Sequence, residues 1–266
     1  MDASLRREYL EAMGIDSWVP RQSSPDSGVM DAASTAAQPP PAGPVEREAD
    51  AELPSWLEEV PPPTEEWAES EMPDSAPAAV DAVASLDWPA LIYRVAQCSA
   101  CELHAGRRQT VFGVGDSSAN LMVIGEAPGA EEDRRGEPFV GRAGQLLNAM
   151  LLAIGLQRDQ VYIANILKCR PPGNRDPRPD EALKCEPFLL RQVALVRPKV
   201  ILAVGKIAAQ NLLKSQETVG RMRGKAFHFE SVPVVVSYHP AYLLRSPDQK
   251  AKAWQDLQRV AGLLKV

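Results

Sequence analysis

The sequence is poor in cysteine, histidine and aromatic residues. Its 266 residues include 4 cysteines and 3 histidines, and 6% of them are aromatic. So few cysteines in so long a chain exclude the disulfide scaffold of small secreted domains. No run approaches the roughly 20 apolar residues of a membrane helix, and the first residues lack the apolar core of a secretory signal. We therefore expect a cytoplasmic protein without membrane contact.

Positive charge is scarce in the first third of the chain. Residues 1–88 contain 19 acidic residues, four arginines and no lysine, a net charge of −15, and they hold 12 of the 24 prolines. Residues 89–266 contain 16 acidic and 25 basic residues, a net charge of +9. The overall charge of −6 hides this division. The basic part has either an ordinary basic surface or one that binds a polyanion such as nucleic acid.

The N-terminal segment divides into a short helical pattern and a linker. Residues 1–19 predict a short amphipathic helix with four apolar side chains on one side, Leu5, Tyr9, Leu10 and Met13. Residues 20–84 are dominated by proline, alanine, serine and acidic residues, which bury too little apolar surface to offset the ordering entropy. We expect an acidic, mostly disordered arm before a folded domain at 85–266. The arm is either a solvated spacer or a tether whose helix binds a partner protein.

The remaining sequence alternates between apolar runs and helical patterns. Four runs rich in β-branched residues predict buried strands at 121–124, 161–164, 200–204 and 232–236. Helical patterns occupy 143–154, 180–196, 205–213 and 249–264. Buried strands separated by helices are typical of a parallel sheet covered on both faces. The predicted fold is therefore a three-layer α/β/α domain with a central, four-stranded, mainly parallel sheet.

Chemically distinct side chains follow the predicted strands. Glu126, Asn165 and His239 each come directly after a strand or within a few residues of its end, and Gly205 directly follows the third strand. Open α/β sheets bind ligands at the carboxyl ends of their strands. A carboxyl, an amide and an imidazole are therefore expected to meet in one site. The other two histidines, His104 and His228, are assigned structural roles.

The four cysteines have the spacing of a metal site. They form a Cys-x2-Cys pair and two later single positions: Cys98, Cys101, Cys169 and Cys185. Four thiolates fit either a tetrahedral zinc ion or a [4Fe-4S] cluster, and the spacing leaves that choice open. Buried cysteines without a metal are the third alternative.

Two segments have the composition of a DNA-contacting edge. The irregular loop after Cys169 carries Arg170 and Arg175, which are either ordinary surface residues or phosphate contacts. After His239, a leucine pair stands beside a base, so Leu243 or Leu244 could enter a base stack while Arg245 holds a phosphate.

The segment from Gly125 to Gly141 combines a glycine-containing turn, a charged stretch and an aromatic residue. The glycines permit close backbone approach. Phe139 stands just before a predicted helix, where it is either a core residue or a stacking platform for a base, and the second role needs an exposed ring face.

Taken together, these motifs resemble family 4 uracil-DNA glycosylases, the iron-sulfur branch of that superfamily. The resemblance covers roughly residues 89–264 and rests on the Cys-x2-Cys pair, Gly125 to Asp133, Pro138 to Gly141, Asn165 to Pro172, Cys185 and His239-Pro240. It implies that the four cysteines ligate a structural [4Fe-4S] cluster. The N-terminal arm lies outside it.

The resemblance also implies roles in excising uracil from DNA. Phe139 would stack on the extruded uracil, Asn165 would read its N3 donor and O4 acceptor, and His239 would bond to O2. Glu132 would occupy the space beside C5 and exclude the methyl group of thymine. Glu126 would position or polarise the attacking water, a role that Asn165 could share.

One position departs from other branches of the superfamily. Several of them carry Asp or Asn after the residue that corresponds to Glu126, whereas this chain has Ala127, a small residue that is also usual in family 4. Ala127 is therefore assigned to the substrate pocket without a chemical role.

Two other functions remain as alternatives. One is a non-catalytic nucleic-acid-binding module associated with DNA replication, which would not need an acid, an amide and an imidazole together. The other is a glycosylase for another deaminated base such as hypoxanthine, against which Glu132 and Asn165 favour uracil. We expect a monomer that acts on uracil-containing DNA.

Overall fold

The computed structural model describes residues 83–265. The helix predicted within 1–19, and all but the last two residues of the linker predicted at 20–84, lie outside the described residues. Val83 is 5% exposed and belongs to the hydrophobic core. The folded domain therefore includes at least two residues before the predicted start at 85.

The domain is built on a six-stranded sheet in the order β1-β3-β2-β4-β6-β5. Four parallel strands form its centre: β2 (Leu121–Gly125), β3 (Tyr162–Asn165), β4 (Val200–Val204) and β6 (Val232–Ser237). These are the four predicted strands, within one or two residues. The predicted number of strands was wrong, because β1 (Val114–Gly115) and β5 (Phe227–Phe229) add antiparallel pairs at the two edges.

Both edge strands lack the usual sequence signals. β1 is two residues long and ends at Gly115, which has a φ of 113°. β5 is joined to β6 by Glu230 and Ser231, with φ values of 48° and 67°. Two-residue hairpin turns with positive φ at both positions usually contain Asn-Gly or Asp-Gly. Because Glu-Ser fills the turn here, the usual hairpin signal is missing from the sequence.

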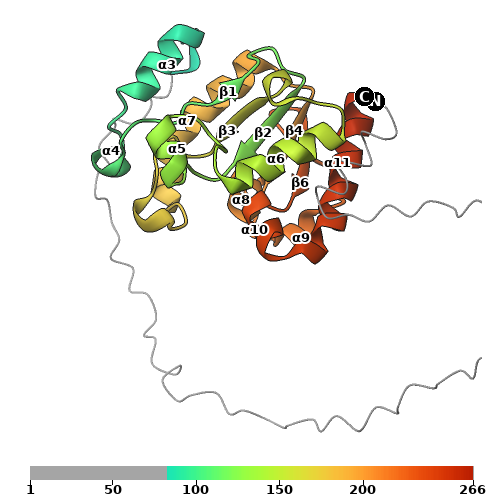
Figure 1. Cartoon of the computed structure of the whole chain (residues 1–266). Helices are drawn as coiled ribbons and strands as arrows, with labels where there is room; N and C mark the ends of the chain where they lie inside the picture. The colour runs from blue at the N-terminus through green and yellow to red at the C-terminus, as the bar shows by residue number, and fades with distance from the viewer. Residues whose placement is uncertain (1–82, 266) are drawn as a thin grey trace, which may run out of the picture. The chain divides into compact units, whose positions relative to one another are not determined.

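Helices cover both faces of the sheet (Figure 1). They are α3 (Trp88–Ala96), α4 (Leu103–Gly106), α5 (Ala130–Arg135), α6 (Arg142–Ala153), α7 (Pro179–Val196), α8 (Lys206–Leu213), α9 (Val219–Met222), α10 (Pro240–Arg245) and α11 (Lys250–Leu264). Between Val83 and Lys265, none of them combines the length and the hydrophobicity that a bilayer span requires. The three-layer α/β/α prediction is confirmed.

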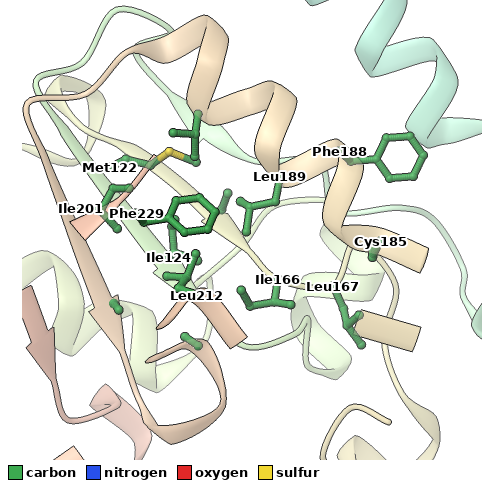
Figure 2. Close-up of a cluster of buried hydrophobic side chains, with 14 of the residues drawn as sticks. Met122, Ile124, Ile166, Leu167, Cys185, Phe188, Leu189, Ile201, Leu212 and Phe229 are labelled. Atoms are coloured by element: carbon green, nitrogen blue, oxygen red, sulfur yellow. The ribbon is translucent and has the colours of Figure 1, made fainter. Parts of the chain in front are cut away.

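The core lies in two layers, one on each face of the sheet. Alternate strand residues point to opposite faces. Met122 and Ile124 of β2 pack with residues of α3, α7 and α8, and part of this cluster is drawn in Figure 2. Leu121 and Val123 of the same strand pack with residues of α6 and α11. Burial on both faces explains why the central strands are continuously apolar, and it holds their carboxyl ends rigidly at one edge.

Candidate active site

A pocket with a volume of about 480 Å³ opens at the carboxyl ends of β2, β3 and β6. Every residue assigned from the sequence to catalysis or to the substrate lines it: Glu126, Ala127, Glu132, Phe139, Asn165 and His239. Strand pairing brings Glu126 and Asn165 together, because Gly125 is paired with Asn165. Beyond this pair, the N–H of Leu167 donates to the carbonyl of Glu126 at 3.0 Å. The volume suits one small ligand.

The carboxyl group of Glu126 is partly buried in this pocket. Its burial, and then the negative charge of Asp176, raise the pKa of Glu126 to about 7. A carboxyl with this pKa is partly ionised at neutral pH, and it can accept a proton from a bound water.

Asn165 ends β3 and is only 2% exposed. Its peptide unit is held on both sides. The carbonyl of Asn165 accepts a hydrogen bond from Lys168 Nζ at 2.8 Å, and the following N–H, of Ile166, donates to the carbonyl of Gly125 at 2.9 Å. An amide offers an acceptor next to a donor, so a fixed Asn165 can pair with a ring edge that offers the complement.

His239 is a neutral hydrogen-bond donor at neutral pH. It caps the N-terminus of α10, and its Nδ1 accepts the N–H of Ala241 at 3.1 Å. Burial, and then the positive charge of Arg245, lower the pKa of His239 to about 4, although Glu132 acts in the opposite direction. Since Nδ1 is an acceptor and the ring is neutral, the proton is on Nε2. Nε2–H is the donor that this side chain can offer to a ligand.

Phe139 adopts a left-handed backbone conformation with a φ of 53°. Its ring stacks on that of His239 with centroids 5.6 Å apart and an interplanar angle of 28°. The residue is only 7% exposed and packs in the hydrophobic core. Its small exposed part lines the pocket. A bulky residue with positive φ is strained and persists where its surroundings fix it. Gly144 is part of these surroundings, because a Cβ at that position would lie 1.8 Å from the Phe139 carbonyl oxygen.

Glu132 joins two segments of the pocket wall. One carboxylate oxygen accepts the N–H of Gly129 at 3.1 Å, at the start of α5. The other accepts the N–H groups of Val140 and Gly141 at 3.0 and 3.3 Å. The side chain therefore fixes the turn after β2 against the segment that carries Phe139. This backbone role was not foreseen from the sequence, although Glu at the third helical position is a known capping signal.

The loop at residues 170–178, called the arginine loop below, is anchored at the start of α7. Two guanidinium nitrogens of Arg175 donate to the two carboxylate oxygens of buried Glu181, at 2.9 and 2.6 Å. Glu181 also accepts the N–H of Arg178 at 2.8 Å. Arg175 lines the pocket, whereas Arg170 lies outside it and donates to Asn174 at 2.7 Å. The ion pair fixes the backbone of this loop and neutralises the charge of Arg175.

The residues predicted to contact DNA after His239 differ in their exposure. Leu243 is 1% exposed and packs in the core with α6 and α11, so it has no surface to insert between bases. Its assignment as a wedge is wrong, because α10 turns this side chain inward. Leu244 is 37% exposed, and Arg245 is exposed at the pocket wall. Tyr242, which no sequence motif marked as a site residue, also lines the pocket.

The four cysteines line one small cavity at the side of α7: Cys98, Cys101, Cys169 and Cys185. Two of the sulfur atoms receive hydrogen bonds, from Arg107 to Cys169 Sγ at 3.1 Å and from the N–H of Lys168 to Cys185 Sγ at 3.3 Å. Donors of this kind stabilise metal-bound thiolates. In residues 83–265, no three His, Cys, Asp or Glu side chains are grouped closely enough to hold a single metal ion. Thiols are the type of donor that iron-sulfur clusters use, and these four share one cavity.

The folded domain is similar to known proteins over most of its length. Residues 112–258 match the profile of the Uracil DNA glycosylase superfamily. A type-4 uracil-DNA glycosylase of Archaeoglobus fulgidus is 43% identical over 181 residues, which cover 65% of this chain and 91% of the relative. The chain belongs to the type 4 uracil-DNA glycosylases. A second type 4 relative, of Thermotoga maritima, is 38% identical over 176 residues, 65% of this chain and 92% of the relative.

Another branch of the superfamily is more distant. A type-5 uracil-DNA glycosylase of Pyrobaculum aerophilum is 35% identical over 146 residues, 48% of this chain and 64% of the relative. The type 4 relatives match a longer part of this chain at higher identity, as the resemblance predicted.

Gly125 is a site residue that was not expected individually from the sequence. A Cβ at this position would lie 2.5 Å from Asn165 Oδ1 and 2.7 Å from Phe139 Cζ. Only glycine lets both side chains approach the end of β2. The available signal was a glycine between an apolar strand and an acidic residue. Such a glycine indicates that another group approaches the backbone closely, but it does not identify that group.

Proposed function

We propose that the protein is a DNA-repair glycosylase that hydrolyses the N-glycosidic bond of deoxyuridine in DNA. It would release uracil and leave an abasic site, the first step of base excision repair. The observation that carries this proposal is the convergence of a neutral imidazole donor, a buried amide and a titratable carboxyl in one pocket, those of His239, Asn165 and Glu126.

Uracil would be recognised by its edges and its flat faces. Phe139 stacks on the extruded ring, and the Asn165 amide pairs with N3–H and O4. His239 donates from Nε2 to O2. Glu132 occupies the space beside C5 and excludes thymine, while Ala127 leaves room for the ring. Support for these roles comes from the position of all five residues on the pocket wall.

The reaction breaks the bond between C1′ and N1 and adds water across it. Positive charge develops on the sugar and negative charge on the departing uracil, spread over O2 and O4. Donors from His239 and Asn165 would stabilise that negative charge more strongly in the transition state than in the ground state. A neutral His239 suits this role, because it donates a hydrogen bond without giving up a proton.

Water completes the reaction at the sugar. Glu126, as a carboxylate, would orient the water toward C1′ and take one of its protons while the water oxygen bonds to C1′. Uracil leaves as an anion and gains a proton at N1, so the net change is one water consumed. The side-chain amide of Asn165 is a second group that could orient this water.

DNA would bind across the mouth of the pocket with the target nucleotide extruded. Arg170, Arg175 and Arg245 would contact phosphates, and Leu244 would fill the gap in the base stack. The burial of Leu243 leaves Leu244 as the leucine with an exposed side chain for this role.

The cavity between the cysteines would hold a [4Fe-4S] cluster with Cys98, Cys101, Cys169 and Cys185 as ligands. The cluster would supply structural support, since Cys169 immediately precedes the arginine loop. Iron and sulfide content and visible absorption of anaerobically purified protein test this assignment. Zinc in place of iron would overturn it.

The activity is tested by release of free uracil from a uracil-containing oligonucleotide. A matched thymine oligonucleotide is the negative control, and a hypoxanthine oligonucleotide tests the alternative substrate. We expect release from the uracil strand alone. Binding without release, by protein with a full complement of metal, would make it a nucleic-acid-binding module instead.

A further inference from the structure

Lys168 is a buried cation in an unusual position. It is 1% exposed and lies between β3 and the arginine loop. In the part of the chain between Val83 and Lys265, no carboxylate forms an ion pair with it. Burying an ammonium group is costly unless its hydrogen bonds and its charge are compensated. The side chain therefore needs both acceptors and a source of negative charge.

The hydrogen bonds of Lys168 connect the candidate catalytic amide with the cysteine cavity. Its Nζ donates to the carbonyl of Asn165 at 2.8 Å and to Gln192 Oε1 at 2.6 Å. Its backbone N–H donates to Cys185 Sγ at 3.3 Å, and the residue lines the cavity between the four thiols. Cys185 belongs to α7 (Figure 2). One residue thus touches both sites.

The second acceptor is itself fixed. Gln192 of α7 is fully buried, and its Nε2 donates to the carbonyl of Phe112 at 2.9 Å and to the hydroxyl of Tyr162 at 3.0 Å. Tyr162 begins β3, the strand that Asn165 ends. Fully satisfied buried polar networks rigidify their surroundings. This one ties both ends of β3 to α7.

We propose that Lys168 is a positioning residue that couples the cysteine cluster site to Asn165. This inference rests on the function and on the cluster proposed above. Thiolate ligands would supply the negative charge that the buried ammonium lacks, and the ammonium in turn fixes the Asn165 carbonyl. Because the next N–H is bonded to Gly125, the whole peptide unit is held, and with it the direction of the Asn165 side chain.

The test compares Lys168→Met with Lys184→Met in the full-length protein. Lys184 lines the same cavity, but its side chain is 50% exposed, and its ion pair is with Asp180. Both variants remove one positive charge near the thiols. We expect Lys168→Met to lower the single-turnover rate of uracil release about 10-fold or more, with DNA affinity changed less than about 3-fold. Lys184→Met should stay within about 2-fold of the wild type.

A second readout separates coupling from general loss of structure. The reduction potential of the cluster should fall in Lys168→Met, because a nearby cation stabilises the reduced, more negative cluster, and it should fall less in the solvent-screened Lys184→Met. Should Lys168→Met not fold, Gln192→Met carries the test: with iron content unchanged, its rate should fall several-fold.

The outcomes separate the two proposals. No uracil release by wild-type protein overturns the proposed function. The positioning role alone is overturned if the wild type is active and Lys168→Met, with full iron content, releases uracil at the wild-type rate. A Gln192→Met protein with wild-type rate overturns it as well, if that variant has to carry the test.

Discussion

At the level of single residues, burial disfavours charge on two titratable groups of the pocket, Glu126 and His239. It raises the pKa of Glu126 to about 7 and lowers that of His239 to about 4. At neutral pH the imidazole is therefore neutral, while the carboxyl is partly ionised. Two groups whose pKa values are moved apart by their surroundings can take different roles in one reaction.

The first prediction concerns the pH dependence of uracil release. If the Glu126 carboxylate is the active form, the single-turnover rate should rise with pH and level off above about 7, because the carboxyl ionises there. Glu126→Gln should lower the rate and abolish this rise. His239→Asn is the control, which should be slower yet keep the rise, since His239 is already neutral above pH 5. A rise that survives in Glu126→Gln would assign it to another group.

A second prediction follows from the same carboxyl and concerns stability. A raised pKa in the folded state means that this group favours folding below about pH 4.5, the unfolded value, and that the contribution is lost as pH rises through about 7. Glu126→Gln should therefore be more stable than the wild type at pH 8, by roughly 1 to 3 kcal/mol after allowance for partial exposure. Urea unfolding at pH 8 and pH 5 should show this gain shrinking at the lower pH.

The third prediction addresses the two donors. Asn165→Ala and His239→Ala should each lower the single-turnover rate by about 100-fold to 1,000-fold, the usual loss when a donor to a developing negative charge is removed. Binding to a uracil-containing duplex, measured by fluorescence anisotropy, should change only a few-fold. An equal loss of binding would contradict the catalytic assignments.

At the level of elements, the end of β2 is sensitive to the smallest side chain. Gly125→Ala would place a methyl group against Asn165 and Phe139. We expect at least a 100-fold lower rate and about 1 to 3 kcal/mol lower stability, since the packed strands leave little freedom to relax. Gly262→Ala in α11 is the matched control, because nothing lies within 4 Å of its Cβ. Equal activity of the two variants would show that the site tolerates the displacement.

The elements also show what the sequence could and could not reveal. Continuous β-branched runs located the four central strands, since both faces of the sheet are buried. The edge strands escaped because one is very short and the other follows a Glu-Ser turn. Residue types at strand ends pointed to Glu126, Asn165 and His239, which the structure brings together in one pocket. Leu243 was misassigned because neighbouring leucines do not reveal which of them a short helix turns inward.

At the level of the whole molecule, charge is divided between an acidic arm and a basic domain. The net charge of residues 89–266, +9, is what a DNA-binding domain needs, and every residue assigned to the pocket or to the cysteine site belongs to this part. Deleting residues 1–82 should therefore leave uracil release by purified protein within about 2-fold of the full-length rate at 150 mM salt.

This deletion ends before Val83 because that residue is buried in the core. A cut placed after Ala84 should give the same activity with a lower melting temperature and is a useful companion. A large loss of activity on removal of residues 1–82 alone would make the arm part of the enzyme.

Trp88 gives the domain a built-in fluorescent reporter. The chain has five tryptophans, of which only Trp88 and Trp254 lie after residue 82. The ring of Trp88, at the start of α3, meets the rings of Phe112 and Tyr162 edge-on, each at 5.3 Å. Phe112 and Tyr162 also accept the hydrogen bonds that Gln192 Nε2 donates. In protein lacking residues 1–82, undocking of α3 would expose more of this partly buried indole and shift its emission to longer wavelength over the background of Trp254. Detachment of the Cys98 and Cys101 segment can then be followed without an added label.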